Sequence, residues 1–483
     1  MSRPAKALPT VAASQGEDAS LAFARNVVRT RFEDLPPAAV RAARANIMDG
    51  IAVALAATTT TPACREMAEL AKELGGKPEA SLIGFGGKVP AHMAAWVNAA
   101  LVHSLNYNDI FDAYWSHPGG TLLPVALASA ERAGRVSGKE FLTAYVLGLD
   151  MMGRLGRAVF PPKPVRDWAS YGWLPPQIFG YFGGAAVAGR LLGLTETQQL
   201  SAFGLAYSQA AGNMEPLFGV GADKGIYQSY PAQQSILSVL MAQKGIAGAP
   251  RSLEGKAGLF RLFFHGEYDP EALTADLGRR YMAEELGMYA FPCCGYTQAY
   301  VAETLKLVRE KQIRPADVES VTLFVGPRAM NLCEPREVRC SPRNISEAQM
   351  SIPFTVATAI AKGTPRIEHF TPQGLRDPEI LAMAAKVRWQ ADPACDKSYG
   401  TAIIDAGVEI GLKGGRNARF RYHGVRYGHP QNPIGEAELK EKYRDCMTYS
   451  AKPMTAAATA ELISTLDRLE SLEDVSPILQ MIA

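Results

Sequence analysis

The stretch that decides the fold is LPPAAVRAARANIMDGIAVALAA, residues 35–57. Its apolar residues recur at helical spacing, and five of them share one face: Val40, Ala43, Ile47, Ile51 and Leu55. The proline pair stands where a first helical turn tolerates proline. The stretch therefore predicts a helix that buries this face against other helices.

Helical spacing continues from residue 35 to about residue 287. Later segments of this region, such as GGAAVAGRLLGL (183–194) and LAYSQAAGN (205–213), are rich in small residues. Small side chains let helices approach closely, so the region is predicted to be a dense helical bundle. The same spacing returns in NPIGEAELKEKYRDCM (432–447) and TAAATAELISTLDRLESLED (455–474), and this tail is expected to rejoin the bundle.

The pattern changes between residues 289 and 433. VESVTLFV (318–325) alternates as a strand does, and AGVEIGLKGGRNARFRYHG (406–424) reads as two strands joined at Gly414-Gly415. The predicted fold class is mainly α, a large all-helical domain with a smaller α+β domain. The expected domains are a flexible arm (1–20), the helical domain (21–287), the α+β domain (288–433) and C-terminal helices that return to the helical domain (434–483).

Composition excludes several classes of protein. The chain has 483 residues, is 47% hydrophobic, and carries 50 Lys and Arg against 48 Asp and Glu. No long basic run is present, so nucleic acid is not an expected partner. The uncharged window 168–189 contains prolines and five glycines, which favours a buried helix start over a membrane span. The seven cysteines form no CxxC pair and predict reduced thiols in a cytoplasmic protein.

The common cofactor and nucleophile motifs are missing. There is no GxGxxG after a strand, no GxxxxGK[ST], no HExxH and no GxSxG. Nucleotide binding, metalloprotease and α/β-hydrolase chemistry therefore lose their usual support, and neither a metal nor a cofactor is expected.

Three segments resemble the MmgE/PrpD family: NIMDGIAVALAA (46–57), VNAALVHSLNYNDIFDAYWSHPGGTLLPVALASAE (97–131) and NPIGEAELKEKYRDCM (432–447). The resemblance runs from about residue 21 to the C-terminus. It implies a helical domain, an α+β lid inserted before the last helices, and a homodimer. It also implies chemistry on small carboxylic acids without metal or organic cofactor, in which a proton beside a carboxylate moves and water or carbon dioxide is lost, or a centre is inverted.

The resemblance places the active site in NYNDIFDAYWSHPGG, residues 106–120. His117 matches the family's active-site histidine, and an imidazole both takes and gives protons near neutral pH. Asp109 is a second catalytic candidate, while Asn106 stands where the family has an aspartate. The alternative is that His117 only caps the turn before Pro118. The other histidines, His103 among them, have no motif and are assigned to structure or surface.

Other positions depart from the family pattern. Leu174 replaces a histidine, Gln233 and Tyr289 replace lysines, and Phe354 replaces a tyrosine. Because charge-assisted hydrogen bonds to a carboxylate are stronger than neutral ones, these changes predict a substrate less anionic than citrate.

The remaining candidates follow from these departures. Lys224 matches a lysine that the family often carries and is a candidate for orienting the substrate; the alternative is a solvated loop charge. Tyr289 is a candidate acid/base group, since a phenol can protonate an enolate, and its alternative is core packing. Tyr107 and Tyr171 are expected to form an apolar wall, or to be bundle core. Cys293 and Cys294 are expected to be structural thiols rather than nucleophiles.

Two classes of function remain open at this level. The first is a cofactor-independent lyase acting on a small organic acid, a dehydratase or decarboxylase, with an isomerase or epimerase as its alternative. The second is a homodimer that has lost the chemistry and serves in binding or scaffolding. The altered acid/base set favours the second class, whereas the retained His117 and its polar neighbours favour the first.

Overall fold

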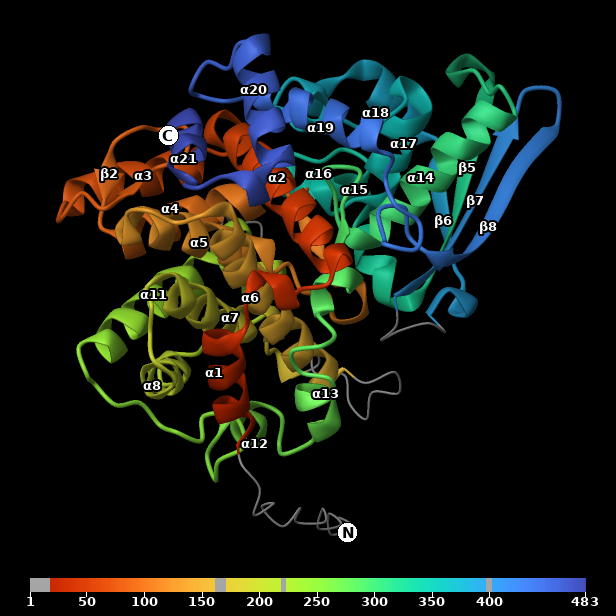
Figure 1. Ribbon diagram of the computed structural model, residues 1–483. Helices are drawn as coiled ribbons and strands as arrows, with labels where there is room; N and C mark the ends of the chain where they lie inside the picture. The colour runs from red at the N-terminus through yellow and green to blue at the C-terminus, as the bar shows by residue number, and fades with distance from the viewer. Residues whose placement is uncertain (1–17, 161–170, 219–222, 397–401) are drawn as a thin grey trace, which may run out of the picture.

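A computed structural model describes residues 18–160, 171–218, 223–396 and 402–483, and most of the predicted N-terminal arm lies outside these ranges. The mainly α fold is confirmed (Figure 1), with a small sheet at one side of the molecule. The helices of the first half are α1 Ala19–Arg29, α2 Pro37–Thr60, α3 Pro62–Leu74, α4 Ala91–His103, α5 Gly119–Ala133, α6 Gly138–Val159, α7 Pro175–Leu191, α8 Glu196–Tyr207, α9 Glu215–Phe218, α10 Asp223–Ile226, α11 Ser229–Gln243, α12 Leu259–Phe263 and α13 Pro270–Thr274.

The second half combines helices with the main sheet. Its helices are α14 Gly295–Glu310, α15 Arg336–Arg339, α16 Ile345–Gln349, α17 Ile352–Lys362, α18 Pro378–Ala385, α19 Glu436–Thr448, α20 Ala456–Asp467 and α21 Ser476–Ile482. The strands of the chain are β1 Ala80–Ser81, β2 Lys88–Val89, β3 Asp109–Ile110, β4 Gly287–Met288, β5 Val318–Val325, β6 Val387–Ala391, β7 Ile403–Leu412 and β8 Arg416–Val425.

The helix predicted from residues 35–57 is α2, and it begins at the proline pair as expected. The predicted face is buried, and in the second half of the helix burial extends beyond that face. Every residue from 46 to 58 is buried, so neighbours surround α2 on all sides. Alanine and glycine fill the positions between the larger apolar side chains, and a helix that is apolar all round belongs in the centre of a core.

Small residues bring α6 and α7 together, as the sequence predicts. A Cβ atom added to Gly148 of α6 would lie 2.4 Å from Val187 Cγ2, and one added to Gly183 of α7 would lie 2.5 Å from Met152 Cγ. Both distances are shorter than any carbon contact, so the two helices depend on glycine where they touch.

The predicted strand 318–325 is β5, and the predicted hairpin is β7 and β8, whose turn contains Gly414 and Gly415 with φ of 83° and 75°. The order in the sheet is β6-β5-β7-β8. The pair β5 and β6 is parallel and the other two pairs are antiparallel. The sequence did not indicate β6 or the two-residue strands β1 to β4.

The C-terminal helices lie against the first half of the chain. Apolar residues of α19, α20 and α21, among them Cys446, Leu462 and Ile482, belong to the same buried cluster as α2 and α6. The sheet and α17 share a second cluster. Figure 1 shows α20 and α21 beside the helical part and the sheet at the opposite side. The exact domain limits at residues 287 and 433 stay predictions.

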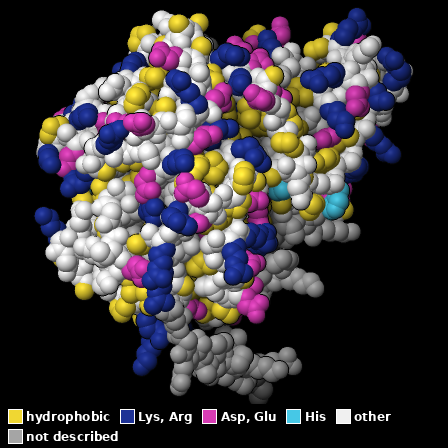
Figure 2. All heavy atoms as spheres, viewed as in Figure 1, with side chains coloured by type: hydrophobic (Ala, Val, Ile, Leu, Met, Phe, Trp, Pro, Cys, Tyr) yellow, Lys and Arg dark blue, Asp and Glu magenta, His cyan; other side chains and the backbone are white. Residues whose placement is uncertain are grey.

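On the face seen in Figure 2, Lys and Arg side chains are interspersed with Asp and Glu rather than gathered into one basic stripe. In the described part of the chain, no single helix is both long and apolar enough to cross a membrane. The bent pair α2 and α3, with 91° between the two helices, passes that test of length and composition only when taken together.

Candidate active site

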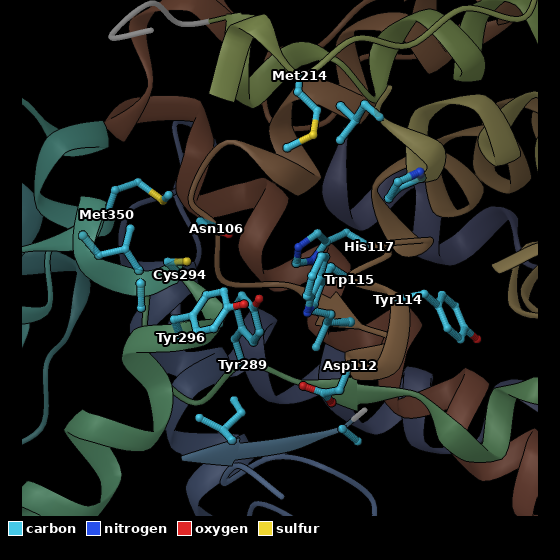
Figure 3. A pocket seen from close by; sticks show the side chains of 18 of the residues that line it. Asn106, Asp112, Tyr114, Trp115, His117, Met214, Tyr289, Cys294, Tyr296 and Met350 are labelled. Carbon is cyan, nitrogen blue, oxygen red and sulfur yellow. The ribbon is translucent and has the colours of Figure 1, made fainter. Parts of the chain in front are cut away.

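A cavity of about 290 Å³ lies between the helical part and the α+β part. Residues of the segment after α4, of the start of α7, of the start of α14 and of β7 line it together. Figure 3 shows His117 and Trp115 next to Tyr289, with Cys294 and Tyr296 beyond them. Its size suits a small organic molecule, and most of its wall is apolar.

The backbone of β3 orients His117. The Nδ1 atom of His117 lies 2.5 Å from the backbone oxygen of Asp109. A carbonyl oxygen only accepts hydrogen bonds, so Nδ1 carries the proton and donates it. When the ring is neutral, Nε2 therefore holds the lone pair and can act as a base. The Gln228 side chain donates to the backbone oxygen of His117 at 3.2 Å and holds the same turn from the side of α11.

Asp109 lies behind His117 and is fully buried, and it does not line the cavity. Its carboxyl accepts hydrogen bonds from Asn108 Nδ2 at 2.9 Å and from the Gly119 amide at 2.8 Å. Burial raises the pKa of Asp109 to about 7, although the Gly119 amide opposes the rise. Asp109, predicted as a catalytic residue, therefore lies behind the backbone that holds His117 and not at the cavity surface.

The raised pKa of Asp109 gives the stability of the fold a pH dependence. An ordinary aspartate in the unfolded chain ionises near pH 4, so the folded state holds an extra proton between about pH 4 and pH 7. The stabilising contribution of this site is complete below about pH 4 and is lost as the pH rises to about 7. We expect urea unfolding to show this loss in the wild type and not in Asp109→Asn.

The quantity to compare between the wild type and Asp109→Asn is the slope of the free energy of unfolding with pH, not its value at one pH. Asp109→Asn must turn an amide group towards either the Asn108 or the Gly119 donor, and this costs about 1–3 kcal/mol at every pH. Parallel pH curves for the two proteins between pH 4 and pH 7 would show that Asp109 does not titrate there.

Tyr289 lies against His117 at the cavity wall. Its ring and that of His117 meet edge to face, with centroids 5.5 Å apart. The pairing of β4 with β3 fixes this approach, and the Tyr289 amide donates to the backbone oxygen of Asn108 at 3.1 Å. Tyr289 is 2% exposed, and burial raises its pKa well above the ordinary value, so its hydroxyl stays protonated and available as a donor.

A buried ion pair lies under Tyr289 and connects the two parts of the chain. Arg426, directly after β8, is fully buried and donates to both carboxyl oxygens of Asp112 at 2.6 and 3.0 Å. The same guanidinium donates to the Met288 backbone oxygen at 2.6 Å and lies 5.0 Å from the centre of the Tyr289 ring. Asp112 lines the cavity, but its charge is neutralised from behind.

A second buried cation, Lys442 of α19, hydrogen-bonds to the backbone at two places next to the site. Its Nζ donates to the backbone oxygens of Tyr107 at 2.7 Å and Tyr289 at 2.8 Å. The same atom lies 2.6 Å from Asp49 Oδ1 on α2. Burial raises the pKa of Asp49 and the charge of Lys442 opposes this rise. Lys442 therefore fixes the backbone on either side of the cavity.

The structure brings only part of the predicted site together. Asn106, His117, Leu174 and Tyr289 line the cavity. Asn106 has a left-handed φ of 49°, a conformation that asparagine tolerates better than most residues.

The other predicted residues stand apart from the cavity. Tyr107 is buried beneath Lys442, and Phe354 is fully buried against Phe370. Gln233 points to Met93, with its Nε2 3.1 Å from the sulfur, because its position on α11 faces α4. Tyr171 is 47% exposed and its ring lies against His265. The side chain of Lys224 lies outside the described residues.

Sequence reasoning missed several lining residues. His103, which we assigned to structure or surface, lies on the cavity wall with its ring centroid 5.0 Å from that of His117. Its Nδ1 lies 3.3 Å from Asn108 Oδ1, which connects it to Asp109. The signal was available, because His103 ends the apolar helix directly before the polar stretch. Tyr227 and Trp173 also line the cavity, and no motif marks either of them.

The described cavity wall carries few charged side chains. Among the described lining residues there is no lysine or arginine, and the carboxylates present are Asp112 and Asp405. Asp405 pairs with His423 at 2.6 Å. Within the described ranges, no group of three or more His, Cys, Asp or Glu is placed to hold a metal ion.

Comparison with known proteins identifies the family. The MmgE/PrpD N-terminal domain matches residues 21–271 and the MmgE/PrpD C-terminal domain matches residues 291–468. The chain belongs to the MmgE/PrpD family, and it is an enzyme of that family.

Curated relatives cover most of the chain. A cis-aconitate decarboxylase of Mus musculus is 26% identical over 409 residues, which are 82% of this chain and 79% of the relative. A cis-aconitate decarboxylase of Homo sapiens is 26% identical over 399 residues, 80% of this chain and 79% of the relative. One from Aspergillus terreus (strain NIH 2624 / FGSC A1156) is 24% identical over 472 residues, 93% of each chain.

Proposed function

We propose that this enzyme is a lyase that removes carbon dioxide or water from a small organic acid with fewer carboxylates than citrate. The observation that carries the proposal is the pair His117 and Tyr289, which face each other in a cavity whose described lining has no lysine or arginine. Decarboxylation is the reaction we favour, because the curated relatives named above are decarboxylases.

The arrangement supplies the two proton positions that such a reaction needs. In a decarboxylation, the bond to the carboxyl carbon breaks, its electron pair stays on the substrate carbon, and protonated His117 or the Tyr289 hydroxyl delivers the proton. In a dehydration, His117 Nε2 takes the proton from the carbon beside the carboxylate, and the hydroxide leaves with the proton of Tyr289. Asp109, Lys442 and Arg426 position these groups and do not touch the substrate.

The wall of the cavity supports a weakly charged substrate. Trp115, Phe160 and Leu174 present apolar surface where each additional carboxylate would lose its hydration. An ionised group is expensive to bury without a partner, and the described lining offers no lysine or arginine to a second or third carboxylate. The homodimer and the cytoplasmic location expected from the sequence remain part of the proposal.

Substrate charge is the direct test. In a panel of organic acids, we expect unsaturated or β-hydroxy monocarboxylates to be turned over at about 1 per second or faster, and citrate, 2-methylcitrate and cis-aconitate far more slowly. The measurement is release of carbon dioxide, or of the unsaturated product, at equal enzyme concentration. His117→Asn serves as the control for contaminating activity. Fast turnover of a tricarboxylate would contradict the proposal.

The isomerase alternative has its own signature. If deuterium from heavy water enters the acid, or a stereocentre inverts, with no loss of carbon dioxide or water, the enzyme is an isomerase. If no acid in the panel is turned over or exchanged, the proposed substrate class is wrong.

A further inference from the structure

The start of α14 opens on the cavity. Cys294, Gly295 and Tyr296 all line it, and α14 is a helix of 16 residues. The first amides of a helix lack partners within the helix, and the helix dipole places partial positive charge there. Here the N-cap residue Cys294 makes no side-chain capping hydrogen bond, and the first turn contains no acidic residue.

The Tyr289 hydroxyl supplies a second, independent sign of a ligand. Tyr289 is 2% exposed and lines the cavity, and its hydroxyl makes no hydrogen bond to another described residue. A Cβ added to Gly295 would lie 2.6 Å from this oxygen, so the hydroxyl points at the first residue of α14. Figure 3 shows Tyr289 beside Cys294 and Tyr296. The Tyr289 hydroxyl is not among the fully buried polar atoms that lack a partner, so it is open to the cavity and can donate to a bound acceptor.

We propose that the Gly295 amide and the Tyr289 hydroxyl form the carboxylate subsite of this cavity and bind a single carboxylate group of the substrate. The inference rests on the proposed function, since it names the element that holds the acid. It also accounts for how an acid is held where the described lining offers no cationic side chain. A helix N-terminus binds anions through its amides and dipole.

The location of this subsite fits the position of His117. The Tyr289 ring that carries the hydroxyl also meets the His117 ring edge to face at 5.5 Å. An acid bound at the start of α14 therefore extends towards the imidazole. Glycine at position 295 is what allows this approach, because any Cβ there would meet the hydroxyl.

Two substitutions at Gly295 distinguish the loss of the amide hydrogen from the added volume of a side chain. Gly295→Pro removes the amide hydrogen, and Gly295→Ala adds a comparable Cβ but keeps it. Proline is tolerated at the first position of a helix, and Cys294, with φ of −54° and ψ of 148°, has the extended conformation that must precede proline. The difference between the two variants therefore reports the amide donor.

Binding is measured with benzoate and with benzamide, its neutral counterpart of the same shape, by titration calorimetry without turnover. We expect the wild type to bind benzoate at least about tenfold more tightly than benzamide. Gly295→Pro should bind benzoate about tenfold more weakly than Gly295→Ala, while benzamide changes little. Tyr289→Phe should weaken benzoate binding by about five- to tenfold and serves as the second variant if Gly295→Pro does not fold.

The outcomes separate the subsite from the lyase activity. Equal affinity for benzoate and benzamide in the wild type, or equal benzoate affinity in Gly295→Pro and Gly295→Ala, would overturn the subsite. Preference for benzoate that depends on Gly295 supports it even if the acid panel shows no lyase turnover, in which case only the proposed function fails.

Discussion

Replacing His117 by asparagine should lower turnover of the best acid in the panel by about 10²- to 10⁴-fold while leaving the fold intact. General acid/base groups contribute rate factors of this size. The asparagine amide can still donate to the Asp109 backbone oxygen that now accepts from Nδ1, so the turn before α5 keeps its hydrogen bond. The proton-transfer function of the ring is lost. The measurement is the initial rate at saturating substrate, together with thermal melting.

Two comparisons make the result specific. His92→Ala, on α4 and away from the cavity, is the matched control and should turn over at the wild-type rate. If His117 only caps the turn, His117→Asn will retain the wild-type rate. His117→Ala will then lower the free energy of unfolding by only about 0.5–1.5 kcal/mol, the contribution typical of one hydrogen bond. A wild-type rate in His117→Asn would therefore remove His117 from the mechanism.

Replacing Arg426 by methionine should reduce the free energy of unfolding by about 3–5 kcal/mol. The substitution leaves Asp112 buried without its bidentate partner and removes the donor to the Met288 backbone oxygen. Asp112 is 7% exposed, so a carboxylate that loses its partner there is rehydrated only in part and most of the cost of burial remains. Urea unfolding followed by tryptophan fluorescence measures the loss.

The double variant Asp112→Leu with Arg426→Met tests the cause. It removes both charges, so it should recover most of the stability that Arg426→Met alone loses. Arg314→Met breaks an exposed pair with Asp317 at 2.7 Å and should cost less than about 1 kcal/mol. If the double variant is as unstable as Arg426→Met, the cost comes from lost packing around Tyr289 and not from the unpaired carboxylate.

The sequence predicts the fold where a local pattern determines the element. The period of residues 35–57 locates α2, and the alternation and glycine pair of residues 406–424 locate β7 and β8. It does not predict features that depend on distant partners. β6 is a strand because Val387–Ala391 pairs in parallel with β5, about 60 residues earlier in the chain, and β3 exists only through its pairing with β4.

The residues of the site likewise fall into those that the sequence predicts and those that depend on distant partners. His117 and Tyr289 could be singled out from the family resemblance, and the structure places both on the cavity wall. The partners that hold them could not, because Asp112 and Arg426 are 314 positions apart and Arg426 belongs to no motif. Gln233 shows the opposite failure, since its alignment with a family lysine suggested the site while its place on α11 turns it towards Met93.

The position of Lys442 has a consequence for how the protein is made. The loop before β3, the strand end at Tyr289 and Asp49 all precede it in the chain by more than 150 residues, yet all three meet at its ammonium group. While the protein is being synthesised, the ribosome must release both the helices and the sheet before this group emerges. The nascent chain therefore carries an incomplete site until α19 has left the exit tunnel, and activity can begin only after translation of this helix.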